Sequence, residues 1–181
     1  MRRSRFGAVM VAAVIGLPMV ASSASAQCTA SGAPANCGLP GTVSMTAGRV
    51  VRLQMSAVST PLTAPVPADF DAGFNATTGP TLTVSSNAAW TLHIRAAAAT
   101  WTATNTSPGA PARTNKPAAD LKWSTASNGS FAALTASDVN LVTGAATASS
   151  ATTLYFQTLY SWTLDTPGNY SMAVILTLTS P

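Results

Sequence analysis

The stretch LTVSSNAAWTLHIR (residues 82–95) decides the fold class. Apolar side chains alternate with polar ones on both sides of a short turn at residues 86–88. The apolar members are Leu82, Val84, Trp90, Leu92 and Ile94. A period of two places one face of a strand in a core and the other face in water. The stretch therefore predicts an antiparallel hairpin of two half-buried strands.

Strand patterns continue on both sides of this hairpin. Further strands are predicted at residues 51–56, 99–104, 121–124, 139–142, 152–164 and 170–179. The last two runs flank the sequence DTPGN, in which Pro167 and Gly168 suit the central positions of a turn, so we expect a second hairpin there. The final run is apolar on both faces, which favours a central position in a sheet.

Two proline-rich stretches, residues 57–80 and 105–119, interrupt these patterns. Proline removes a backbone donor and confines any strand to an edge, so both stretches are expected to be surface loops. The sequence as a whole predicts an all-β fold. We expect a two-sheet antiparallel β-sandwich, immunoglobulin-like or pilin-like, with about seven to nine strands.

The N-terminus has the features of a cleavable export signal. Arginines occupy positions 2, 3 and 5, an apolar run covers residues 7–20, and small residues lead up to Ala26. The apolar run is shorter than the roughly twenty residues that cross a bilayer, so we expect cleavage after Ala26 and no membrane span in the mature chain. The predicted organisation is a signal peptide (1–26), an N-terminal segment (27–48) and a single β-sandwich domain (49–181). We expect a protein that is secreted or held at the cell surface or in the periplasm.

Cleavage would leave a nearly neutral chain. The mature sequence carries six basic residues and five aspartates, a net charge of +1. So weak a charge gives no electrostatic footprint for nucleic acid or for an anionic membrane. The two cysteines, Cys28 and Cys37, lie nine residues apart and would meet an oxidising compartment, so we predict a local disulfide between them. A redox role is disfavoured because the Cys-x-x-Cys spacing is absent.

The sequence offers few groups for catalysis or metal binding. His93 is the only histidine and lies on the polar face of a predicted strand, so we favour a solvated histidine over a general base. The stretch Asp69-Phe70-Asp71 places oxygen ligands at alternate positions but lacks the later glutamate of a calcium loop, and solvated aspartates are the favoured interpretation. We therefore expect no catalytic residues, no metal and no cofactor.

The tryptophans allow a second function, because flat aromatic faces can stack on sugar rings. Trp90 and Trp162 alternate in step with leucines, which predicts that both lie in the core. Trp101 and Trp123 have polar neighbours and flank a proline-rich loop. These two residues are the predicted ligand platform if the domain binds a glycan.

The C-terminal sequence PGNYSMAVILTLTSP (167–181) resembles the closing strand of bacterial exported surface β-sandwich domains of the spore-coat-U-like and fimbrial type. Residues 82–96 resemble a mid-domain hairpin of similar proteins. The resemblance implies structural subunits of fibres or coats, often assembled by donation of a strand from a neighbour's N-terminus. Residues 27–41 depart from that pattern, because they are rich in Gly, Pro and Cys and lack alternating apolar residues.

Together these features predict a non-enzymatic structural or adhesive domain of the bacterial cell surface or periplasm. Its partners would be further copies of itself or other surface proteins. A carbohydrate-binding module that uses Trp101 and Trp123 is the alternative, and a hydrolase that uses paired aspartates is the third possibility.

Overall fold

Ten strands make up most of the regular structure in the described residues, 27–39, 41–105 and 111–181, of this computed structural model. The predicted signal peptide, residues 1–26, lies outside them. The elements are β1 (Val51–Met55), α1 (Pro67–Ala72), β2 (Phe74–Ser86), β3 (Trp90–Ala96), β4 (Thr102–Thr104), η1 (Ala118–Asp120), β5 (Leu121–Ser124), β6 (Ala132–Ala133), β7 (Val139–Gly144), β8 (Thr147–Leu159), β9 (Asn169–Ser171) and β10 (Val174–Thr179).

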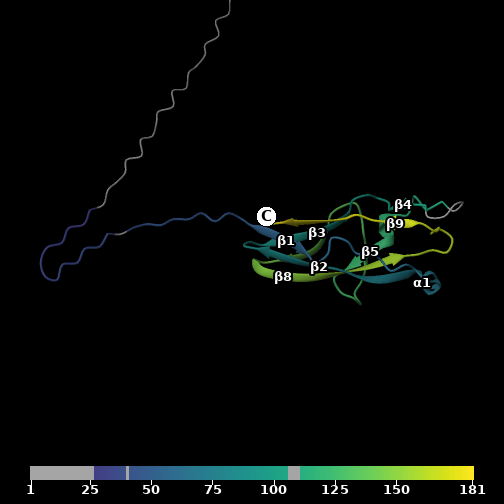
Figure 1. Cartoon of the computed structure of the whole chain (residues 1–181), viewed down its shortest axis with the longest axis horizontal. Helices are drawn as coiled ribbons and strands as arrows, with labels where there is room; N and C mark the ends of the chain where they lie inside the picture. Colours follow the sequence, from purple (N-terminus) through teal and green to yellow (C-terminus); the bar gives the residue numbers. More distant parts are fainter. Residues whose placement is uncertain (1–26, 40, 106–110) are drawn as a thin grey trace, which may run out of the picture. The chain divides into compact units, whose positions relative to one another are not determined.

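The strands form antiparallel sheets stacked in layers (Figure 1). One sheet has the order β1-β2-β8-β5-β6, the second has the order β10-β3-β7, and β4 pairs with β9. This arrangement confirms the predicted all-β sandwich. Two of the ten strands, β6 and β9, are only two and three residues long, which explains why the sequence pattern suggested fewer.

The predicted hairpin at residues 82–95 is wrong in its pairing, although both strands exist. β2 pairs with β1 and β8, whereas β3 pairs with β10 and β7. The turn between them therefore carries the chain from one sheet to the other. Ser86 stabilises this corner, because its hydroxyl donates to the Ala88 carbonyl at 2.7 Å and accepts from the Ala88 amide at 3.2 Å.

The predicted C-terminal hairpin is wrong for a similar reason. β8 ends at Leu159, and the chain then turns through residues 160–168 before β9 pairs with β4 and β10 pairs with β3. β10 lies at an edge of its sheet, not at the centre as predicted. Its residues Val174, Leu176 and Leu178 pack against the core, so its apolar character reflects the packing of one face.

The predicted loop at 57–80 is also wrong over its second half. Pro67 opens α1 at a position where a missing backbone donor has no cost. β2 then continues through Gly79 and Pro80 by means of a bulge between Thr78 and Thr81. A Cβ on Gly79 would lie 2.6 Å from Phe156 Cε2, so close packing against that ring requires glycine. In the other predicted loop, the described residues 105 and 111–119 have regular structure only at an isolated bridge between Thr100 and Pro117 and where η1 begins.

The core lies between the two larger sheets. Its largest fully buried side chains, in order of volume, are Leu82, Leu92, Ile94, Leu134, Leu154 and Val84. Fully burying one such side chain contributes about 1.5–3 kcal/mol. Trp90 of β3 belongs to the same core, and its indole packs against Gly144 of the neighbouring strand β7.

The chain divides into two units, Met1–Thr46 and Ala47–Pro181, and all ten strands belong to the second. In the first unit, Cys28 and Cys37 form the predicted disulfide. The described residues of this unit contain no helix or strand. Among the described residues of the whole chain, no helix has the length and hydropathy that crossing a bilayer requires.

Candidate functional site

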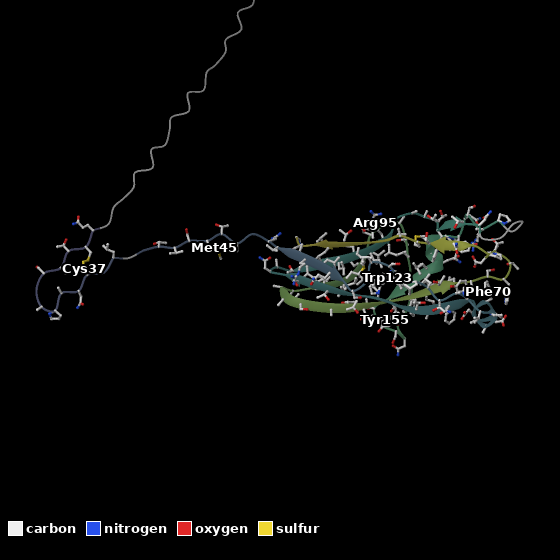
Figure 2. All side chains as sticks on the ribbon, in the orientation of Figure 1. Cys37, Met45, Phe70, Arg95, Trp123 and Tyr155 are labelled. Carbon is white, nitrogen blue, oxygen red and sulfur yellow. A yellow bond between two sulfur atoms is a disulfide. The ribbon has the colours of Figure 1, made fainter. Side chains whose placement is uncertain are left out.

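Trp101 and Trp123, the predicted ligand platform, are buried. Their exposed fractions are 4 % and 7 %, and Figure 2 shows Trp123 between the layers. Trp101 Nε1 donates to the Pro117 carbonyl at 3.1 Å, whereas Trp123 Nε1 has no hydrogen-bond partner among the described residues. The platform prediction is therefore wrong. Trp123 lies in β5 and Trp101 directly precedes β4. Most of their polar neighbours in sequence are more exposed, while both indoles are buried.

The two tryptophans predicted to be core residues have opposite outcomes. Trp90 is 3 % exposed, and its Nε1 donates to the Ala145 carbonyl at 2.8 Å, so this prediction is confirmed. Trp162 is 60 % exposed and lies beyond the end of β8, so the core prediction is wrong for it. The apparent alternation with leucines continued past Leu159, where the strand ends.

The polar residues singled out from the sequence are dispersed. His93 lies half-buried on the outer face of β3, with Nε2 3.4 Å from Thr179 Oγ1. Asp69 accepts a hydrogen bond from the Val66 amide and caps α1, and Asp71 accepts one from Trp162. Neither aspartate is part of a calcium loop, because both lie in the helix. Within the described ranges, no three His, Cys, Asp or Glu side chains gather as metal ligands would.

Four charged residues meet at the end of the sandwich near α1, and we call them the charge cluster: Arg113, Lys116, Asp120 and Asp165. Lys116 Nζ lies 2.9 Å from Asp165 Oδ1 and 3.2 Å from Asp120 Oδ2, and Arg113 contacts the same two carboxylates. Two positive and two negative charges cancel within the cluster. It anchors the turn at residues 160–168, because Asp165 also accepts a hydrogen bond from the Ser161 amide.

A cavity of about 550 Å³ opens between the two larger sheets, and we call it the inter-sheet groove. Its walls come from both sheets and from the irregular segment that follows β1. The apolar side chains that line it include Val58, Leu62, Leu154, Phe156, Val174 and Leu176. The groove therefore exposes part of the core to a ligand that could enter from the side.

β10 borders the inter-sheet groove with an unpaired edge. Its only hydrogen-bonded strand partner among the described residues is β3. β1 of the other sheet approaches β10 without pairing with it, so the backbone groups on one side of β10 have no strand partner. The strand is six residues long and contains neither proline nor charge. An apolar, unprotected edge of this kind is a template for pairing with another strand.

Residues 42–47, which we call the exposed segment, carry a strand pattern without a strand partner. Val43 is 98 % and Met45 88 % exposed, and they alternate with Thr42, Ser44 and Thr46. Sequence reasoning missed this segment because it looked for alternation in residues 27–41. The signal was present, since Val43, Met45 and Ala47 keep the same period of two as the apolar residues of β1.

Sequence reasoning also missed an aromatic group that sequence spacing could not reveal. Phe70 of α1 stacks on Trp162 with ring centroids 4.6 Å apart, and it lies 5.4 Å from the ring of Tyr160. Phe70 is about ninety positions from Tyr160 and Trp162, and it meets them only because of the sheet topology.

The predicted resemblance to exported surface domains remains a prediction. No protein-family model matches the chain, and neither does any curated protein.

Proposed function

We propose that the protein is a non-enzymatic structural subunit of the bacterial cell surface or periplasm, and that its copies join by strand addition. The observation that carries this proposal is the complementarity between two of its parts. One is the unpaired edge of β10 beside the apolar inter-sheet groove, and the other is the exposed segment with its alternating apolar side chains.

In this assembly the exposed segment of one copy pairs with β10 of the next. Backbone hydrogen bonds to the open edge supply affinity, and alternate side chains that enter the groove supply register. Val43, Met45 and Ala47 would face the groove, while Thr42, Ser44 and Thr46 would face water. The segment has six residues, as does β10, so the two can pair along their whole length.

The arrangement of polar groups supports a non-enzymatic role. The His93 ring lies on an open sheet face, where its nearest side-chain partner is the Thr179 hydroxyl at 3.4 Å. Asp120 and Asp165 face the same cluster but are both held by Lys116 and Arg113. A general acid and base need to exchange protons with a substrate, and carboxylates locked in ion pairs are poorly suited to this.

The export pattern and the disulfide support a location outside the cytoplasm. Cys28 and Cys37 are bridged, as is usual in oxidising compartments. The first 26 residues have the composition of a cleavable signal. Copies released into one compartment could then reach each other's edges.

The test is the oligomeric state of the exported mature protein, measured by light scattering coupled to size-exclusion chromatography over a range of concentrations. We expect concentration-dependent oligomers or fibres. The double variant Val43→Asp and Met45→Asp should remain monomeric, because it would place two charges in the groove. A synthetic peptide of residues 41–50 should bind the monomeric variant and raise its melting temperature.

The matched control is Thr42→Asp with Ser44→Asp, which adds the same charge to the same segment but on the face that remains in water. This control should assemble like the wild type. The proposal would be overturned if the wild type stays monomeric at every concentration and the peptide neither binds the Val43→Asp, Met45→Asp variant nor raises its melting temperature. Equal effects of the two double variants would likewise contradict it.

A further inference from the structure

A second cavity lies at the end of the sandwich that carries α1, and we call it the aromatic pocket. Its volume is about 560 Å³, within the range of roughly 300–1,000 Å³ that is typical of small-ligand sites. The lining residues that matter for recognition are Phe70, Tyr160, Trp162, Thr63 and Asn169. Figure 2 shows Phe70 at this end of the β-sandwich.

Trp162 is exposed yet held in one orientation. Phe70 stacks on it with an interplanar angle of 29°, and its Nε1 donates to Asp71 Oδ1 at 3.0 Å. An indole that is 60 % exposed adds little to the core, so packing does not explain this arrangement. Fixing the ring before a ligand arrives reduces the entropy lost on binding. These features are those of a stacking platform.

The charge cluster at the base of the pocket offers no spare charge to a ligand. The Lys116 ammonium donates to Asp120, to Asp165 and to the Leu159 carbonyl, so each of its three protons has a partner. Asp165 accepts from Lys116, Arg113 and the Ser161 amide. A charged ligand would therefore lose its hydration without gaining an ion pair.

A cationic ligand is disfavoured for a second reason. Lys116 Nζ already lies 5.6 Å from the ring centroid of Tyr160 and 5.9 Å from that of Trp101. These distances are within the range of cation–π attraction, so an internal cation already interacts with two aromatic rings of the pocket.

We infer that the aromatic pocket binds a neutral saccharide, with one sugar ring stacked on Trp162. The C–H bonds on one face of a pyranose carry small positive partial charges that suit the negative face of an indole. Thr63 and Asn169 are exposed and bring a hydroxyl and an amide group that can bond sugar hydroxyls. Tyr160 also lines the pocket, and its phenol hydroxyl is a further hydrogen-bond donor.

The experiment measures binding of neutral and charged oligosaccharides to the mature protein by isothermal titration calorimetry and tryptophan fluorescence. The neutral probes are cellohexaose, mannohexaose and N-acetylated chitohexaose, and the charged probe is hexagalacturonate. We expect at least one neutral probe to bind with a Kd below about 1 mM, and hexagalacturonate to bind at least about tenfold more weakly. Trp162→Ala should weaken neutral binding at least about tenfold, while Trp162→Phe should retain part of it.

The matched control is Tyr155→Ala, which removes an aromatic ring from the outer side of β8, away from the pocket (Figure 2). This variant should bind within about twofold of the wild type. Absence of neutral binding up to about 10 mM would overturn the inference. Equal losses of saccharide affinity in Trp162→Ala and Tyr155→Ala would also overturn it. So would a protein that binds no saccharide but binds the peptide probe decaproline in a Trp162-dependent way.

Discussion

Lys116 and Asp165 form a buried ion pair, with 2.9 Å between Nζ and Oδ1 and side chains that are only 3 % and 7 % exposed. The pair joins the loop before η1 to the turn after β8. Removing two charges from water is costly, and here hydrogen bonds to Asp120, Arg113, the Leu159 carbonyl and the Ser161 amide offset that cost.

Replacing Lys116 by methionine should therefore destabilise the protein by about 3 kcal/mol or more, because Arg113 would be the one cation left in the charge cluster to balance both Asp120 and Asp165. Urea unfolding followed by tryptophan fluorescence would measure the loss. Lys122→Met is the control, since Lys122 is partly exposed on β5 and should change stability by less than about 0.5 kcal/mol. Equal losses in the two variants would contradict this account of the charge cluster.

Gly144→Ala should cost about 1–3 kcal/mol, because the added carbon would lie 2.5 Å from Trp90 Cζ2 and would force the indole out of position. Gly48→Ala serves as the control, since nothing lies within 4 Å of a Cβ at that position. The two variants can be compared by thermal unfolding. If Gly144→Ala leaves the thermal stability unchanged, β3 and β7 can move apart enough to accommodate the added carbon beside Trp90.

Two buried tryptophans should respond differently to the same substitution. Trp101→Phe loses the hydrogen bond from Nε1 to the Pro117 carbonyl, whereas Trp123→Phe loses none. Both variants leave a similar small cavity, so Trp101→Phe should be the more destabilising by about 1 kcal/mol. Parallel urea titrations would measure the difference, and the reverse order would argue against the assigned indole contacts.

Tyr160 should make stability fall at alkaline pH. Burial and the nearby Asp69 and Asp165 raise its pKa above the ordinary value of 10.0, so the folded state holds the phenol proton more tightly than the unfolded state does. The stabilisation is therefore complete below pH 10.0 and is lost as the pH rises through the folded-state pKa. Melting temperatures between neutral and alkaline pH should decline less steeply in Tyr160→Phe, and identical slopes would refute the assignment.

The sequence predicted where strands lie better than how they pair. Alternation at Leu82, Val84, Leu92 and Ile94 reports which side chains are buried, and all four are. The same alternation arises whether two consecutive strands share a sheet or face each other across a core. A short turn such as residues 87–89 fits either arrangement, and here the second applies.

The candidate sites depended on contacts that no local pattern contains. Trp101 and Trp123 had polar neighbours but are buried, and Trp162 seemed to continue a strand that ends at Leu159. The partner that fixes Trp162 is Phe70, which lies in a short helix within a stretch predicted to be a loop. Only the exposed segment could have been found from the sequence, since its alternation is visible in the residues themselves.

The pairing of β2 with β8 also affects when the five-stranded sheet can be completed during folding. Thr81 and Thr153, whose hydroxyls lie 3.1 Å apart, are separated by 72 positions, and the two long strands have little to hold them together before they meet. Closing so large a loop loses entropy before any contact compensates for it, which is typical of slow-folding domains. When the chain emerges N-terminus first, β2 can pair with β1 early, but its other side stays unpaired until the last third of the chain is available. That side of β2 can meet wrong partners during the interval.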